Sequence, residues 1–401
     1  MNAINKSTLR QLAVMNGEYV VSIYVPAATG ADQRQNPVRF KSLVRTAAKQ
    51  MQARGIGEPA IQKMSVTARR LLERDDLWEN LAQGLAVFVS RDATQAMALP
   101  FRCQEICTVG RQADLLPLLD WTSSDATYLV LAVSQKAVRL LRGSRALIEE
   151  ISLPALPKDL ASALHYDVRQ GTLQMHSGQS QFAGKEGIVF HGQGGEVDVA
   201  KIELVEFFRE IDRVVCEFLQ LRRELLVFAG VDYLFPLYQS VNHYGQLASR
   251  PLGGNPELLS SQELCARAWP LVEAELRERE QALAAEKWNS AGRDRTIHRL
   301  VEILSAAEAG AIETLYVARG TRRMGRYLPE AATVRYDAKA QADSEELVNQ
   351  AAVLVLRTSG KVVFLGPEHV PEGDVLAAIL RYPRTPAATS DRGNHIVAGS
   401  K

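Results

Sequence analysis

The sequence predicts a mixed α/β protein built from three domains. Short apolar runs rich in β-branched and aromatic residues alternate with helical patterns of apolar side chains. Two changes of composition, near residues 120 and 252, divide the chain. The length of 401 residues corresponds to two to four domains at about 100–200 residues each. With 46% hydrophobic and 23% charged residues, the composition excludes disordered and collagen-like chains.

The first predicted domain, residues 1–120, is an α/β domain. Residues 19–25 form a β-branched and aromatic run that predicts a strand. Asn36 is the expected N-cap of a helix that begins at Pro37, since asparagine and proline favour these two positions. A second helix is predicted over 61–81, and a buried strand over 85–89.

The second predicted domain, residues 125–250, contains a strand hairpin, a long loop, a long helix and a buried strand. The strands are expected at 128–133, 137–141, 146–151 and 225–230. The loop, 165–198, contains seven glycines. Asp198 is the expected N-cap of an amphipathic helix over 199–221, in which apolar residues recur every three or four positions.

The third predicted domain, residues 252–383, again alternates helices and strands. Its helices are expected at 263–283, 294–309 and 344–356, and its strands at 312–318, 361–365 and 375–380. Gly310 follows the second helix, where glycine commonly ends helices. Residues 384–401 have no periodicity and are predicted to be a disordered tail.

Charge and cysteine content narrow the class of protein. The formal net charge is +1, so RNA contact requires a local basic patch. Four cysteines are too few for a disulfide framework, and no set of residues has the spacing of metal ligands. We expect no metal or other cofactor. The first residues lack a secretory pattern, and no apolar run is long enough to span a membrane. We therefore predict a cytoplasmic protein that binds neither membranes nor DNA.

One motif has the residues for chemistry: His-Gly-Gln-Gly-Gly-Glu at 191–196, at the end of the predicted loop. Adjacent glycines let a main-chain N–H approach a ligand closely, and such a donor can stabilise a developing oxyanion. Gln193, Gly194, Gly195 and Glu196 are therefore the candidate catalytic residues. In the alternative interpretation, glycine and glutamine simply form a flexible connector.

The order of these elements, together with several short motifs, resembles a known family. The hairpin, loop, motif, long helix and buried strand are similar to the central domain of archaeo-eukaryotic peptide-chain release factors and Pelota. Further similarity lies in Val-Ser-Ile-Tyr (21–24), Leu-Val-Leu-Ala-Val-Ser (129–134) and Ala-Ala-Ile-Leu-Arg-Tyr (377–382). Together these resemble the bacterial archaeo-eukaryotic release factor family, and within it the third subgroup.

The resemblance implies an activity and partners. It implies a release-factor-like central domain and a third domain like the kink-turn-binding ribosomal proteins. The activity would be hydrolysis of peptidyl-tRNA on the ribosome, with tRNA or rRNA and a translational GTPase as further candidate partners. The first domain lacks the Asn-Ile-Lys-Ser motif that reads stop codons, so ribosome rescue fits better than codon-specific termination.

Glu196 is a departure from the release-factor pattern His-Gly-Arg-Gly-Gly-Gln. It stands where that pattern has glutamine, whose amide both donates and accepts hydrogen bonds, whereas a carboxylate only accepts. Hydrolysis therefore stays open. The alternatives are a non-catalytic adaptor that binds the ribosome or tRNA, and a non-ribosomal interaction protein on the same scaffold.

Two groups of basic residues are candidates for RNA binding. Arg39, Lys41 and Arg45 lie along the first predicted helix. A second group follows the strand at 312–318 and consists of Arg319, Arg322, Arg323 and Arg326. In the alternative interpretation, the helix face is merely solvated and the arginines pair with nearby acids such as Glu330.

Overall fold

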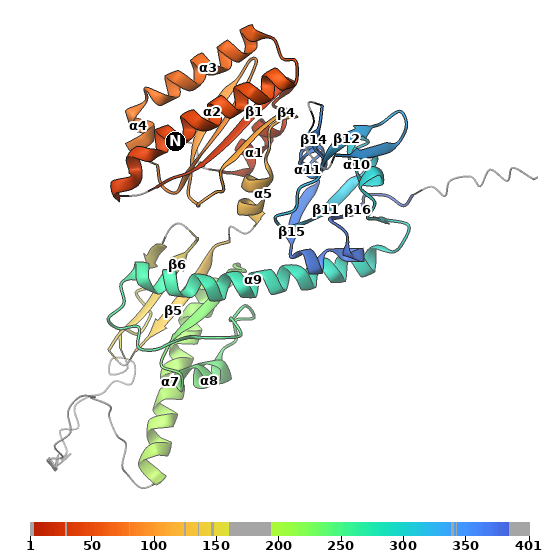
Figure 1. Ribbon diagram of the computed structural model, residues 1–401. Helices are drawn as coiled ribbons and strands as arrows, with labels where there is room; N and C mark the ends of the chain where they lie inside the picture. Colours follow the sequence, from red (N-terminus) through yellow and green to blue (C-terminus); the bar gives the residue numbers. More distant parts are fainter. Residues whose placement is uncertain are drawn as a thin grey trace, which may run out of the picture. The chain divides into compact units, whose positions relative to one another are not determined.

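The computed structural model describes residues 4–28, 30–79, 81–123, 126–134, 136–145, 148–159, 194–337, 341 and 343–384. The chain divides into two compact units. Unit 1 joins residues 1–123 to residues 280–401, and unit 2 comprises residues 124–279 (Figure 1). The mixed α/β class predicted from the sequence is confirmed. The first and third predicted domains have separate sheets but share one unit.

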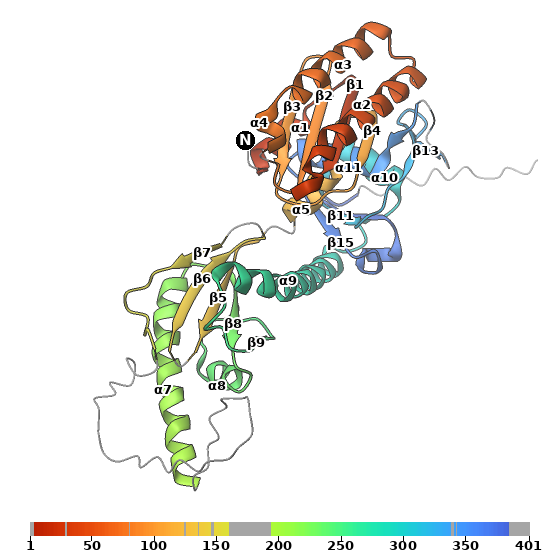
Figure 2. The same cartoon turned by 60° about the vertical axis from the view of Figure 1, so that its left-hand side comes forward.

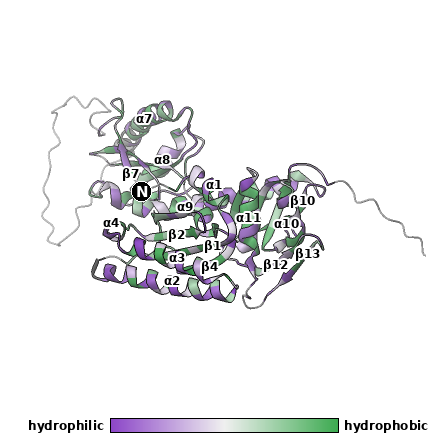
Figure 3. Ribbon diagram, turned by 90° about the horizontal axis from the view of Figure 1, so that it is seen from above, coloured by the Kyte–Doolittle hydropathy of each residue, from purple (hydrophilic) through white to green (hydrophobic). Residues whose placement is uncertain are grey.

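The N-terminal part of unit 1 is an antiparallel sheet with the strand order β3-β2-β1-β4. Its strands are β1 (Asn16–Pro26), β2 (Gly84–Ser90), β3 (Thr94–Leu99) and β4 (Ile106–Gln112). Helices α2 (Gln35–Ala53) and α3 (Glu58–Leu72) cover one face (Figure 2). The part also contains α1 (Lys6–Ala13), α4 (Asp75–Glu79) and α5 (Leu116–Ser123). Both α2 and α3 have hydrophilic and hydrophobic residues along their length, as expected for helices with one solvated face (Figure 3).

The C-terminal part of unit 1 contains two small sheets. The first has the order β10-β16-β11-β15, and the second has the order β13-β12-β14. The strands of the first are β10 (Thr296–Ile297), β11 (Ile312–Ala318), β15 (Lys361–Leu365) and β16 (Leu376–Leu380). Those of the second are β12 (Met324–Leu328), β13 (Thr333–Tyr336) and β14 (Glu345–Glu346). Helices α10 (Leu300–Glu308) and α11 (Leu347–Arg357) pack with β11.

The two parts of unit 1 are joined by a shared hydrophobic core. Strand β1 is buried on both faces, because Val21 packs with the core under α2 and α3 while Val20 and Tyr24 face the opposite side. On that side, the same core includes Val348 and Ala352 of α11. Each part therefore covers an apolar face of the other.

Unit 2 is a five-stranded sheet with the order β7-β6-β5-β8-β9. Its strands are β5 (Tyr128–Val133), β6 (Val138–Gly143), β7 (Ile148–Ile151), β8 (Leu225–Gly230) and β9 (Leu252–Gly253). Helices α7 (Gly194–Leu219) and α8 (Leu234–Val241) contribute to the core on one face. The first part of α9 (Ser261–Ala291) contributes to the core on the other. Strands β5 and β8 pair in parallel and are buried throughout, as expected for central strands covered on both faces.

Several predicted helix boundaries are wrong. The helix predicted over 294–309 is instead the short strand β10 followed by α10, which begins at Leu300, and the helix predicted over 263–283 extends over Ser261–Ala291. Helix α2 begins at Gln35, and Asn36 is not its N-cap: its buried side chain accepts from the Ala28 N–H at 2.8 Å and donates to the Ala28 carbonyl at 3.1 Å. The predicted helix over 61–81 is instead α3 followed by the short α4. Helix α7 begins at Gly194 rather than after Asp198, because glycine is only a weak barrier at a helix end. No described helix is long and apolar enough to cross a membrane.

Candidate functional site

The Gly-Gly-Glu motif lies at the start of helix α7. Gly194, Gly195 and Glu196 are its first three residues and have helical backbone, so they are not part of a loop. Gln193, the fourth candidate catalytic residue, lies outside the described residues, as does most of the predicted loop. The sequence therefore identified the position of the motif but not its backbone conformation.

The helical start gives the motif a specific chemical capacity. The first N–H groups of a helix have no carbonyl partner within it, and the helix dipole adds partial positive charge at this end. The amides of Gly194, Gly195 and Glu196 are in these positions. Neither glycine has a side chain that would keep a ligand from these donors. An oxyanion is the kind of group that such an end binds well.

Helix α7 is anchored through its C-terminal half. Phe208, Ile211 and Val215 are fully buried against the sheet of unit 2. In Figure 1 the N-terminal end of α7 extends beyond that sheet. Further along the helix, the buried carboxylate of Asp212 lies 2.7 Å from Nδ1 of His243 and also accepts from the His243 backbone N–H. The packed C-terminal half thus anchors the helix that begins with the glycine pair.

The four arginines that follow β11 do not form one exposed cluster. The Arg319 guanidinium lies 2.6 Å from Asp120, Arg322 lies 2.6 Å from Asp114, and Arg326 lies 2.7 Å from Asp343. These acids are not the neighbours expected from the sequence. Arg323 is exposed, and its guanidinium donates to the Arg322 carbonyl at 3.3 Å. In this conformation, Arg319 and Arg322 tie the C-terminal part of unit 1 to the N-terminal part.

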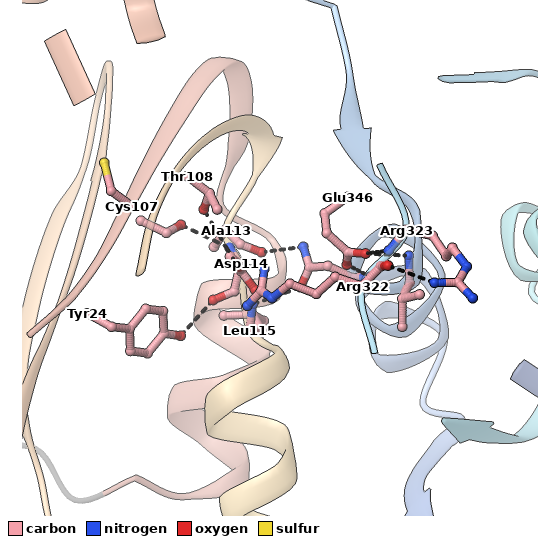
Figure 4. Close-up of polar contacts among 12 residues, drawn as sticks. Tyr24, Cys107, Thr108, Ala113, Asp114, Leu115, Arg322, Arg323 and Glu346 are labelled. Carbon is pink, nitrogen blue, oxygen red and sulfur yellow. Dashed lines mark hydrogen bonds and ion pairs between the residues drawn. The ribbon is translucent and has the colours of Figure 1, made fainter. Parts of the chain in front are cut away.

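Asp114 is the centre of a buried polar network between the two parts of unit 1 (Figure 4). One carboxylate oxygen accepts from Arg322. The Asp114 N–H donates to the Ser22 hydroxyl at 2.9 Å, and its carbonyl accepts from the Tyr24 hydroxyl at 2.6 Å. Asn349 of α11 bridges to the same segment, since it donates to the Ala113 carbonyl and accepts from the Leu115 N–H.

Glu346 lies on the other side of Arg322 and is the N-cap of α11 (Figure 4). Its carboxylate accepts from the backbone N–H groups of Arg323 and Asn349. Burial outweighs these bonds and raises the pKa of Glu346 from 4.5 to about 7. Sequence analysis did not single out Glu346, Asp114 or Asn349. The sequence signal that could have identified Glu346 is its position directly before an apolar helix, where a polar side chain is preferred as the N-cap.

The basic candidates on α2 are all accessible. Lys41 and Arg45 are exposed one helical turn apart, which places them on the same face. Arg39 is about one-third exposed, and its guanidinium lies 4.0 Å from Glu105. RNA binding by these residues stays a prediction. Lys41 and Arg45 form a solvent-exposed basic face on α2.

The described cysteines and acids offer no other reactive centre. No group of three metal-ligating side chains is found among the described residues. The four cysteine thiols are free, and burial raises the pKa of Cys103 to about 11 and that of Cys107 to about 12. These two thiols remain protonated at neutral pH, so neither is a ready nucleophile.

The central region matches a family of known proteins. Residues 128–274, which span the sheet of unit 2 and the first part of α9, match the family model described as bacterial archaeo-eukaryotic release factor family 7. Unit 2 is thus a release-factor-like unit. The chain is related to the archaeo-eukaryotic release factor family, as the sequence motifs implied. The expected third subgroup is not confirmed.

Solved structures of similar proteins come from archaea and yeast. An archaeal translation termination factor is 12% identical over 94% of this chain and 98% of its own, with a TM-score of 0.24. Archaeal Pelota, from a ribosome-bound complex with ABCE1, is 12% identical over 96% of both chains, with a TM-score of 0.38. Dom34 of S. cerevisiae, which interacts with Hbs1, is 11% identical over 76% and 80%, with a TM-score of 0.31. No curated protein matches the sequence.

Proposed function

We propose that this protein acts on the ribosome as a release or rescue factor that hydrolyses peptidyl-tRNA. The observation that carries the proposal is the coincidence of the family match over residues 128–274 with a Gly-Gly pair at the start of α7. At a helix start formed by glycines, no side chain limits how closely the backbone N–H groups approach an oxyanion in a narrow site.

In the proposed reaction, water attacks the ester carbonyl that joins the peptide to tRNA. The amides of Gly195 and Glu196 donate to the carbonyl oxygen as it gains negative charge, and each well-placed donor is worth about 3 kcal/mol. The carboxylate of Glu196 accepts a proton from the attacking water as a general base. The ester C–O bond breaks, and the proton held by Glu196 passes to the leaving oxygen to give the free hydroxyl of tRNA. The peptide leaves as a carboxylic acid, which then loses its proton to water.

Glu196 also supports a second candidate function, that of a non-catalytic adaptor on the ribosome or tRNA. A carboxylate cannot donate a hydrogen bond, and RNA phosphates repel it. In this alternative the protein occupies the ribosome without chemistry. The two functions differ in one product, the released peptide.

A release assay with a Glu196→Gln variant separates these functions. Purified protein is added to stalled ribosomes that carry labelled peptidyl-tRNA, and released peptide and bound protein are both measured. If Glu196 is the general base, the wild type releases peptide and Glu196→Gln is slower by about 10²-fold or more. Binding without release by the wild type, with release gained in Glu196→Gln, would instead establish the adaptor.

The basic face of α2 is proposed as a contact to ribosomal RNA. Co-sedimentation with ribosomes is expected to weaken in a Lys41→Glu/Arg45→Glu variant and to weaken as salt rises, because phosphate contacts release counterions. Arg70→Glu, which changes an exposed arginine on α3, is the matched control. No sedimentation of the wild type even at low salt would favour a non-ribosomal interaction protein on this scaffold.

We extend the proposal to a protein partner, a translational GTPase, as the family resemblance implies. Binding of such a GTPase would be detected as nucleotide-dependent co-sedimentation with this protein on ribosomes. Equal sedimentation with GTP and GDP analogues would contradict this extension while leaving the release assay unaffected.

A further inference from the structure

Strand β3 of unit 1 has one unpaired side. It is the last strand of the N-terminal sheet and pairs with β2 alone (Figure 2). Every residue of β3, from Thr94 to Leu99, lies opposite a residue of the segment 84–89. A strand at the end of a sheet presents a row of backbone N–H and C=O groups that another chain can pair with.

The hydrogen bonds at the two ends of β3 show which backbone groups point outward. The carbonyls of Ala93 and Leu99 both accept from N–H groups in or next to β2. Successive residues of an antiparallel strand direct their backbone groups to opposite sides, so the odd-numbered residues face β2. The groups on the open side belong to Thr94, Ala96 and Ala98. None of these three forms a hydrogen bond on that side with a described residue, and all three are at least partly exposed.

Strand β3 lacks the features that usually protect a sheet edge, which are charged side chains, bulges and short length. Its sequence, Thr-Gln-Ala-Met-Ala-Leu, has no charge, and its register with β2 has no shift. The other edge strands of the described sheets are protected. Those that carry charged residues are β4, β7, β13 and β15, and those that are two residues long are β9, β10 and β14.

We propose that β3 pairs antiparallel with β3 of a second copy of this chain, so that the two four-stranded sheets become one. The outward backbone groups determine the register. Ala96 lies opposite Ala96 of the second copy, and Thr94 lies opposite Ala98 of the second copy. The N-terminal sheet belongs to unit 1 and the Gly-Gly-Glu motif to unit 2, so this pairing is independent of the proposed hydrolysis.

The sequence of β3 favours a second copy as its partner. In a two-fold pairing the central residue meets its own copy, so a charged residue there would repel itself. Ala96 has neither charge nor bulk, whereas the edge strand β13 would bring Arg335 close to another Arg335. On the other face of β3, uncharged Gln95 lies opposite uncharged Met97 of the second copy. A single strand pair buries little surface, so the dimer should be weak, with a dissociation constant in the micromolar range.

Sedimentation equilibrium of the full chain over a range of concentrations tests the proposal. The wild type should change from monomer to dimer as concentration rises. Ala96→Pro removes an outward N–H and no hydrogen bond to β2, so it should fold and dimerise about tenfold more weakly or worse. Thr94→Ala keeps every backbone group of β3 and is the matched control, which should dimerise as the wild type does.

Amide hydrogen exchange of the wild type, followed by NMR, locates the contact and does not depend on the folding of Ala96→Pro. The N–H groups of Thr94, Ala96 and Ala98 should exchange slowly at high concentration and rapidly after dilution. Those of Gln95 and Met97 should exchange slowly at both concentrations, because they face β2. A monomer at all concentrations, equal dimerisation of Ala96→Pro and the wild type, or exchange in β3 that ignores dilution would each overturn the proposal.

Discussion

At the scale of single residues, the arginines after β11 differ in what they contact, although the sequence presents them as one group. Arg322 reaches a carboxylate 208 residues away, and Arg319 reaches one 199 residues away. Sequence analysis located the basic cluster but could not identify these partners, because nothing local to residues 319–326 encodes a contact made by tertiary packing. Arg326 instead pairs at the surface with Asp343, where both side chains are roughly half exposed.

Replacing Arg322 is expected to destabilise unit 1 more than replacing Arg326. Arg322→Ala leaves the buried carboxylate of Asp114 without its charged donor, at a cost of about 2–3 kcal/mol after allowing for the partial exposure of Arg322. Arg326→Ala breaks a surface pair worth about 0–1 kcal/mol. Urea denaturation measures both losses. Equal losses would show that the Asp114 pair has no special structural role.

Glu346 is expected to make the stability of unit 1 depend on pH. Its pKa is about 7 in the folded protein against an ordinary 4.5, so the folded state keeps a proton that the unfolded state releases between these values. This contribution is complete below about pH 4.5 and is lost as pH rises through 7, by up to about 3 kcal/mol. Urea unfolding at pH 5, 6, 7 and 8 measures it.

The Glu346→Gln variant provides the control for this pH dependence. Glutamine cannot ionise, yet its side-chain oxygen can still accept from the N–H groups at the start of α11. The difference in unfolding free energy between pH 5 and pH 8 should therefore be smaller in the variant. An unchanged difference would assign the pH dependence to other groups.

Among the helices and strands, the burial of side chains determined which elements could be predicted from the sequence. Strands β8, β11 and β15 occupy the predicted ranges, because most of the residues in each are apolar and must be covered. Strands β3 and β12 were not predicted, since they mix exposed and buried residues and lie in sheets that the chain assembles from distant segments. The start of α7 was predicted too late because two glycines read as a loop.

The helical start of α7 leads to a prediction about stability. Alanine is more favourable than glycine in a helix by up to about 1 kcal/mol, so Gly195→Ala should leave the melting temperature of unit 2 unchanged or slightly higher. Circular dichroism at 222 nm and a thermal melt measure this effect. A marked loss of helix would mean that residue 195 requires a backbone conformation reserved for glycine.

At the scale of the whole molecule, the first and third regions of the chain form one unit around a shared core, and the central region forms another. This shared core could not be predicted from the sequence, since an apolar helix face such as that of α11 does not identify the element that covers it. The three domains expected from the sequence stay a prediction. The division into two units describes which parts of the chain pack together.

We expect the two parts of unit 1 to unfold together, because they share one hydrophobic core. In pulse-labelled hydrogen exchange at increasing urea, β1 and α11 are expected to lose protection together, because they contribute to the same core. Strand β8 of unit 2 should lose protection at its own urea concentration. Loss of protection in β1 and α11 at clearly different concentrations would show that the two parts of unit 1 are independent.

The most direct test of the proposed function is the rate of peptide release from stalled ribosomes at saturating protein, measured for the wild type and for Gly195→Ala. The methyl group of alanine would crowd the approach of the 195 and 196 amides to the ester without disturbing helix α7. We predict release well above the factor-free rate for the wild type, and release at the factor-free rate for Gly195→Ala with unchanged ribosome binding. Release at equal rates by the two proteins, or none by the wild type, would contradict the proposed hydrolysis.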